Sequence, residues 1–233
     1  MSRRMPGYII HLTEAKMIGE ILQKQKGMDY SQEWEKAFFY GALLPDAVKK
    51  EKKGISHFWR KKSEDQVTIV PDIDNFLNKY TVTEKDSLSL GYLAHLHLDK
   101  IFWQEYIREN VSFLDIDRCR TESAGSLKYV FVNKKKIYIT PKDFFSEKYL
   151  YGDYTKLNIP LIKKYALKMP VFDKKYANVI EEADNLEMKN LLQKLNQYLS
   201  KEEYNNYELN VFEQKNLEQF LRNTAVKFVQ QYT

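Results

Sequence analysis

The sequence predicts a mainly α-helical protein with one small β-hairpin, and three observations carry this prediction. Apolar residues recur at helical spacing along most of the 233-residue chain. Only residues 127–140 depart clearly from that spacing. The chain contains neither an internal repeat nor a low-complexity linker. We therefore expect a single helical domain over residues 1–233, with the hairpin as an insertion near 127–140.

The first half of the chain contains clear start and stop signals for helices. A serine or aspartate before an apolar run can accept a free backbone N–H at a helix start, and proline lacks the N–H that a helix interior needs. The stretch Thr83-Glu84-Lys85-Asp86 resembles a capping box. On these signals, helices are expected over about Ile9–Gln25, from Ser31 to Pro45, after Pro71–Asp72, and from Thr83 to about Arg108.

The second half begins with the β-type segment. KYVFV and IYIT are rich in β-branched and aromatic residues, and the polar NKKK between them is typical of a hairpin tip. The helices near the end of the chain, within residues 170–233, carry apolar stripes that indicate packing. Helices are expected over about Pro141–Leu150, over Asp153–Lys168 with an interruption or start near Pro160, and over Tyr176–Leu199 and Glu213–Gln231.

The composition is that of a globular protein, with 43% hydrophobic and 30% charged residues. The net charge of +5 is mild, and no recognisable module or concentrated basic stripe indicates specific nucleic-acid binding. Three short basic runs predict solvated loops, although they would also attract phosphate-bearing substrates or a membrane surface: Lys49–Lys53, Arg60–Lys62 and Lys134–Lys136.

The sequence also bears on the cellular compartment. Cys119 is the only cysteine, so no disulfide can form within the chain, which fits a reducing compartment. The first residues, MSRRMPGYII, lack the apolar core of a signal peptide. No stretch approaches the ~18 apolar residues of a membrane helix. We predict a cytoplasmic protein without a transmembrane segment, and the oligomeric state stays open.

The most informative residues are the four histidines of the chain. His95 and Asp99 are separated by one helical turn, so both side chains project from the same face and can converge on one ion. His97 points about 200° around the same helix, so a structural role is expected for it. A simple hydrogen bond between His95 and Asp99 would explain the pair alone. The other two histidines, His11 and His57, lie at the edges of apolar segments.

Asp46 strengthens the case for a metal centre. It follows Pro45 at the end of a hydrophobic helix, where the helix dipole disfavours a carboxylate. An Asx turn would explain Asp46 alone, and a surface or capping role would explain His11. Together, however, imidazoles and carboxylates among aromatic residues are costly to bury unless something compensates them, and a divalent cation would compensate all of them.

The order of these residues resembles the zinc-dependent phospholipase C family, whose superfamily also contains the single-strand-specific zinc nucleases. The similar motifs are His11, G-A-x-x-P-D at Gly41–Asp46, S-H-F at Ser56–Phe58 and G-Y-L-A-H-x-x-x-D at Gly91–Asp99. They cover about residues 5–110, and YGDYTKLN at Tyr151–Asn158 adds weaker support. The resemblance implies an all-helical bundle whose zinc site is built from residues 5–110.

The resemblance also implies a role for each matching residue. His11, His57 and His95 match zinc-binding histidines, and Asp99 matches an aspartate that bridges two metal ions. Asp46 matches a metal-binding aspartate that acts on the attacking water. Two departures limit the site: the processed N-terminal amine of the secreted members has no match, and the later histidines that build a third zinc site are missing. We expect one or two Zn²⁺ ions, with Fe or Mn as alternatives.

The predicted function is metal-dependent hydrolysis of phosphoric esters, with the substrate class left open. Zinc lowers the pKa of a bound water toward ~7, and Asp46 would orient or deprotonate that water. Asp153 is a further candidate as a ligand or as an acceptor behind the ligands, although a helix N-cap is the more frequent role. The alternatives are a non-catalytic metal-binding protein with a structural or interaction role, and an HD-like nucleotide phosphohydrolase. The latter would need an adjacent His-Asp pair, which the chain lacks.

Overall fold

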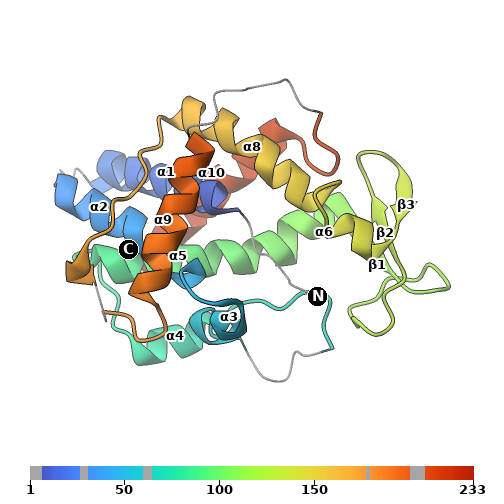
Figure 1. Ribbon diagram of the computed structural model, residues 1–233, viewed down its shortest axis with the longest axis horizontal. Helices are drawn as coiled ribbons and strands as arrows, with labels where there is room; N and C mark the ends of the chain where they lie inside the picture. Colours follow the sequence, from blue (N-terminus) through green and yellow to red (C-terminus); the bar gives the residue numbers. More distant parts are fainter. Residues whose placement is uncertain (1–6, 27–30, 60–64, 177–178, 200–207) are drawn as a thin grey trace.

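A computed structural model describes residues 7–26, 31–59, 65–176, 179–199 and 208–233, and this part of the chain is mainly helical. The prediction of a mainly α-helical protein is thereby confirmed. Figure 1 shows α5 (Ser87–Ile101) running through the middle of the molecule, and a small sheet standing at one end. The described helices that pack closely against α5 include α1 (Tyr8–Lys26), α2 (Gln32–Gly41), α4 (Ile73–Lys79) and α10 (Gln214–Tyr232).

Short segments connect these helices. Between α2 and α4 lie the 3₁₀ turns η1 (Leu44–Asp46) and η2 (Lys50–Lys52), followed by α3 (Lys53–Ser56). After α5 the chain continues through the π-helical turn η4 (Phe102–Tyr106) into α6 (Ile107–Asn110). The later elements are α7 (Pro141–Phe144), α8 (Leu150–Tyr165), η5 (Lys174–Tyr176) and α9 (Asn185–Leu199).

The predicted hairpin is confirmed, but a further strand joins it. Strands β2 (Tyr129–Val132) and β3 (Ile137–Ile139) pair antiparallel around the NKKK tip. The missed strand, β1 (Val111–Leu114), pairs antiparallel with β2 and places Val111 opposite Val132. Because β1 follows directly on α6, it attaches the sheet to the end of the helical run that begins with α5.

Several predicted helix boundaries were wrong, and hydrogen bonding gives the reasons. Ser31 caps α2 as expected, but α2 already ends at Gly41, and Pro45 lies within η1. The N-cap of α5 is Asp86, whose Oδ1 accepts a hydrogen bond from the backbone N–H of Ser89, so the helix does not begin at Thr83.

The later boundaries differ in a similar way. Pro160 neither interrupts nor starts α8, because that helix continues through it. The helix that Pro141 begins ends already at Phe144. The helix expected from Tyr176 begins only at Asn185, after the turn η5. No helix among the described residues has the length and apolar character needed to cross a membrane.

Two glycines allow α2 and α5 to pack unusually close. A Cβ atom on Gly41 would lie 2.1 Å from the carbonyl oxygen of Leu88, and one on Gly91 would lie 2.1 Å from the carbonyl oxygen of Phe38. Each glycine therefore touches the backbone of the other helix, where only a hydrogen atom fits. This close approach places the C-terminal end of α2 against the middle of α5.

Replacing Gly91 with alanine should force the two helices apart. We expect the free energy of unfolding to fall by roughly 1–3 kcal/mol, as for other overpacked sites. Urea unfolding measures this change. Gly19→Ala in α1 is the matched control, because a Cβ there meets no atom within 4 Å. That variant should be neutral or slightly stabilised, since alanine favours helices over glycine. Equal effects of both substitutions would contradict the close packing at Gly91.

Candidate metal centre

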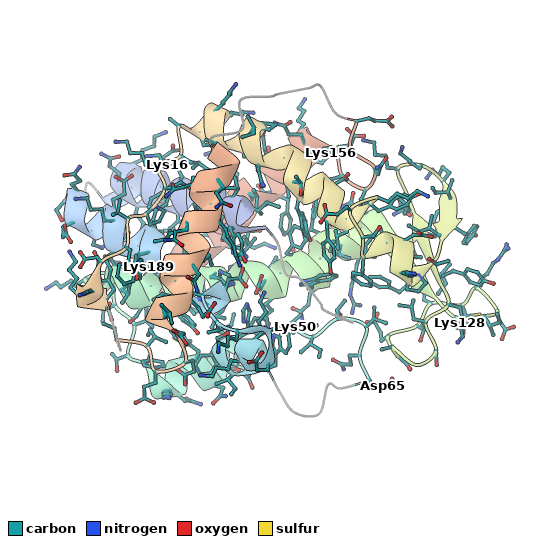
Figure 2. The ribbon with its side chains drawn as sticks, viewed as in Figure 1. Lys16, Lys50, Asp65, Lys128, Lys156 and Lys189 are labelled. Carbon is teal, nitrogen blue, oxygen red and sulfur yellow. The ribbon has the colours of Figure 1, made fainter. Side chains whose placement is uncertain are left out.

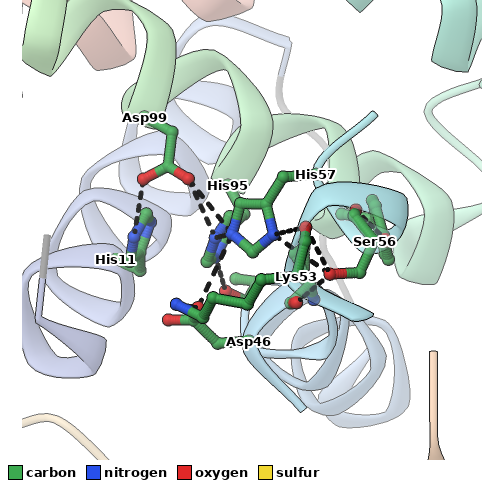
Figure 3. A network of polar contacts seen from close by, with 10 residues as sticks. His11, Asp46, Lys53, Ser56, His57, His95 and Asp99 are labelled. Atoms are coloured by element: carbon green, nitrogen blue, oxygen red, sulfur yellow. Dashed lines mark hydrogen bonds and ion pairs between the residues drawn. The ribbon is translucent and has the colours of Figure 1, made fainter. Parts of the chain in front are cut away.

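The structure brings together the five residues that the sequence singles out as metal ligands. They come from four separate segments: α1, the turn η1, the residue after α3, and α5. All are buried in a core that offers little water to solvate them. Figure 3 shows them in one cluster: His11, Asp46, His57, His95 and Asp99. Their proximity is a property of the fold, and their role as metal ligands stays a prediction.

Backbone carbonyl groups fix which ring nitrogen carries the proton in two of the histidines. The Nδ1 atom of His95 lies 2.8 Å from the carbonyl oxygen of Ala42, at the end of α2. The Nδ1 atom of His57 lies 3.0 Å from the carbonyl oxygen of Lys53. A carbonyl oxygen only accepts, so both Nδ1 atoms must donate. In the neutral rings both Nε2 atoms are then proton-free acceptors, and they face each other at 3.3 Å.

Two carboxylate oxygens complete this group of acceptors. Oδ2 of Asp99 lies 3.3 Å from Nε2 of His57 and 3.4 Å from Nε2 of His95. Oδ1 of Asp46 lies 3.5 Å from Nε2 of His57. Ligand atoms of a tetrahedral ion at bond lengths of about 2.1 Å are about 3.4 Å apart. The separations among His57, His95 and Asp99 therefore match the edges of one face of a tetrahedron around an ion of zinc size, and Asp46 lies at a similar distance from His57.

Direct hydrogen bonding accounts less well for these distances. Charge-assisted N–H···O bonds are usually about 2.7–2.9 Å long, and the contacts here are longer. Both oxygens of Asp99 are buried without a hydrogen-bond partner among the described residues, whereas Oδ1 of Asp46 is paired with the ammonium of Lys53. Buried carboxylate oxygens are rarely left without a partner. The convergence of Nε2 of His57, Nε2 of His95 and Oδ2 of Asp99 therefore favours a cation.

Asp99 also faces His11 with its second oxygen. Its Oδ1 lies 3.3 Å from Nε2 of His11, while Oδ2 faces His57 and His95. The ring of His11 stacks on that of His95, with centroids 3.7 Å apart and planes 7° from parallel. Two overlapping groups could hold an ion: one includes His11, Asp46 and His95, and the other His57, His95 and Asp99. The two groups share His95, and Asp99 faces His11 with one oxygen and the other two histidines with the second.

The pKa shifts of the two aspartates also favour a cation in the cluster. Burial raises the pKa of Asp46, but the Lys53 ammonium and the His57 ring outweigh burial and hold that pKa well below its usual range. Burial likewise raises the pKa of Asp99, and the neighbouring His95 and His11 reverse the shift to a net lowering. Both aspartates are therefore ionised at neutral pH.

The histidines respond in different ways. Burial, reinforced by His95, lowers the pKa of His11 to about 4. Burial also lowers the pKa of His57. For His95, burial acts downward as well, but Asp99 and Asp46 outweigh it and raise the pKa. The cluster therefore favours a positive charge at its centre, which either a proton on His95 or a metal ion supplies.

Sequence reasoning missed three residues that shape this site. Lys53 lies in the basic run Lys49–Lys53, and its Nζ is 2.5 Å from Oδ1 of Asp46. The hydroxyl of Ser56 donates to the carbonyl oxygen of Pro45 at 2.7 Å and also lies 3.0 Å from Nδ1 of His57. These contacts hold the histidine against the turn that carries Asp46.

Glu14 is the third missed residue, one turn after His11 in α1. Its side chain is buried, and Oε1 has no hydrogen-bond partner among the described residues. Burial raises its pKa well above the usual range, and the charge of Asp99 adds to the effect. The spacing of Glu14 from His11 on one helix was the available signal, because residues three apart share a face.

The expectations for His97 and Asp153 had different outcomes. His97 points away from the cluster, as predicted: its ring packs edge-on against Phe228 and Tyr232 of α10.

Asp153 does not cap a helix N-terminus, which corrects that prediction. It lies inside α8, and its oxygens accept hydrogen bonds from the backbone N–H groups of residues 210–212 at 2.7–3.0 Å. These bonds satisfy the carboxylate and tie α8 to the start of α10.

Comparisons with known proteins do not assign this chain to a family. No family model, no curated protein and no solved structure matches it. The chemistry of the cluster is therefore argued from its own geometry.

Proposed function

We propose that this protein is a metal-dependent hydrolase of phosphoric esters, of the zinc-dependent phospholipase C type. The observation that carries the proposal is the spacing of three buried acceptors, which lie 3.3–3.4 Å from one another: Nε2 of His57, Nε2 of His95 and Oδ2 of Asp99. Oδ1 of Asp46 lies 3.5 Å from Nε2 of His57. Imidazole with carboxylate is a donor set that suits Zn²⁺, with Fe and Mn as alternatives. The order of the ligands along the chain, which resembles that family, supports the choice of reaction.

Each residue has a separate task in this proposal. His57, His95 and Asp99 would hold one ion, and His11, Asp46 and His95 would hold another that shares His95. An ion bound there would supply a more acidic water and a positive charge that stabilises a phosphoryl group. Asp46 would orient the water and accept its proton, because its carboxylate is the most exposed of the cluster. The carbonyl groups of Ala42 and Lys53 keep the rings oriented.

The burial of the cluster favours a second candidate, a structural metal site without turnover. The side chains of His11, His57, His95 and Asp99 have no exposed surface, and that of Asp46 is only 3% exposed. Structural metal sites are closed by protein ligands, whereas catalytic sites keep a position open for water or substrate. Metal binding alone therefore does not distinguish the two candidates.

Metal analysis and activity measured on one preparation distinguish them. We expect purified protein loaded with Zn²⁺ to retain about one or two ions by mass spectrometry, and to hydrolyse at least one class in a panel of phosphomonoesters and phosphodiesters. Removal of the metal by a chelator should abolish turnover, and added Zn²⁺ should restore it. Full metal occupancy without hydrolysis of any ester would favour the structural site. Absence of metal binding would contradict both.

A further inference from the structure

Among the residues that the structure describes, Lys53 is the lysine that forms an ion pair with the cluster. It is the first residue of α3, and its Nζ forms an ion pair of 2.5 Å with Oδ1 of Asp46. Its side chain is 19% exposed, whereas that of Asp46 is 3% exposed. Figure 3 shows Lys53 beside Asp46 at the edge of the cluster. Because Lys53 and Asp46 are the exposed members of this group, a ligand from solvent would meet the site through them.

The charges of the cluster change the role of Lys53 when an ion binds. Asp46, whose Oδ1 pairs with Lys53, belongs to one of the two groups that could hold an ion. A divalent cation bound to Asp46 would compete with Lys53 for this carboxylate and would replace the ion pair. The ammonium then adds a positive charge that no group of the cluster compensates. An uncompensated, partly buried charge favours binding of an anion.

The surface on this side is also basic. Lys49, Lys50 and Lys52 are exposed just before Lys53 in the chain. Lys50 lies beside α3 in Figure 2. These three lysines are solvated, as expected for the run, whereas Lys53 is not. Their position next to Lys53 gives them a second effect, attraction of negatively charged ligands. The next basic run along the chain, Arg60–Lys62, lies outside the described residues.

We propose that Lys53 is a phosphate-binding residue: its ammonium pairs with Asp46 while the cluster holds no ion, and with a phosphoryl oxygen once a divalent cation has taken Asp46. This inference rests on the proposed function and makes it more specific, because it selects substrates that carry an anionic phosphoryl group. The lysine is suited to both tasks, since an ammonium on a flexible stem can reorient between two acceptors. Its backbone carbonyl, meanwhile, stays bound to Nδ1 of His57.

The test measures binding of inorganic phosphate and of Zn²⁺ by titration calorimetry. In zinc-loaded protein, Lys53→Met should weaken phosphate binding by roughly 10- to 100-fold, as expected for the loss of a charged hydrogen bond. The same variant should bind Zn²⁺ as tightly as the unmodified protein or more tightly, because Asp46 no longer has a competing cation. Lys50→Met is the control, since it removes an equal charge from the exposed part of the run. It should change phosphate binding no more than a few-fold.

Lys53→Arg keeps the charge and protects the test against a folding defect, so phosphate binding should largely persist in it. Equal phosphate affinity in Lys53→Met and the unmodified protein would overturn the assignment, and so would a loss of Zn²⁺ affinity. If the unmodified zinc-loaded protein hydrolyses esters but Lys53→Met retains phosphate binding, only the role of Lys53 is wrong. If the unmodified protein neither binds phosphate nor hydrolyses any ester, the proposed function fails as well.

Discussion

Replacing His95 with alanine should remove the metal from the protein, whereas replacing His97 with glutamine should leave the metal content unchanged. His95 contributes a proton-free nitrogen to the group of acceptors and lies 3.4 Å from Oδ2 of Asp99. His97, two residues later, contacts Phe228 and Tyr232 on the opposite side of α5. Loss of a residue behind a ligand already costs about 10- to 100-fold in metal affinity, so loss of a ligand should cost more.

The measurement is Zn²⁺ affinity by competition with a chelator of known affinity, together with thermal unfolding of both variants. His97→Gln is expected to lower stability without changing affinity, because its ring is buried among aromatic side chains. The pair of variants therefore separates metal binding from general packing. Equal loss of metal in both would mean that the cluster responds to any disturbance of α5, and the assignment of His95 as a ligand would be wrong.

The sequence was sufficient for the parts of the site that depend on local spacing. The separation of His95 and Asp99 by one turn put both on one face of a helix, and the helix was clear from its apolar pattern. The same spacing excluded His97. His11, Asp46 and His57 could not be placed by spacing, because they come from different segments. The order of the motifs, interpreted as a resemblance to the zinc-dependent phospholipase C family, suggested them, and the fold brings them together.

The geometry that makes the cluster a candidate metal centre could not be predicted. The proton positions on His57 and His95 depend on the carbonyl groups of Lys53 and Ala42, which any residue type could offer. The carbonyl of Ala42 reaches His95 only because glycines at two crossing helices allow a very close approach. Neither glycine signals this contact in the sequence, since glycine also occurs at turns and helix ends.

Charged residues with more than one plausible role were the main source of error. Lys53 belongs to a run that resembles any solvated basic loop, and only the fold shows that its ammonium meets Asp46. Asp153 follows a glycine in a motif similar to the family, yet its carboxylate binds the backbone of residues 210–212. Long-range pairing decides such roles, and neither composition nor periodicity carries information about it.

Replacing Asp46 with asparagine should reduce turnover far more than it reduces binding of substrate. Asparagine keeps the size of the side chain and one oxygen that can contact an ion, but it loses the negative charge and the capacity to accept a proton from water. We expect kcat on the best phosphoester to fall by roughly 10²- to 10⁴-fold, the usual contribution of a positioned acid or base. KM should change much less, because His57, His95 and Asp99 still hold an ion and Lys53 is freed from its ion pair with Asp46.

Asp153→Asn is the matched control, since it makes the same chemical change in a buried carboxylate whose partners lie in the backbone of residues 210–212. It should lower stability and leave kcat of the folded protein intact. Steady-state kinetics of both variants at full metal occupancy measure the difference. A normal kcat in Asp46→Asn would show that this carboxylate neither positions water nor accepts its proton. Because Asp46 is the ligand nearest to solvent, no other member of the cluster is placed to take over that task, and the structural metal site would then be the better explanation.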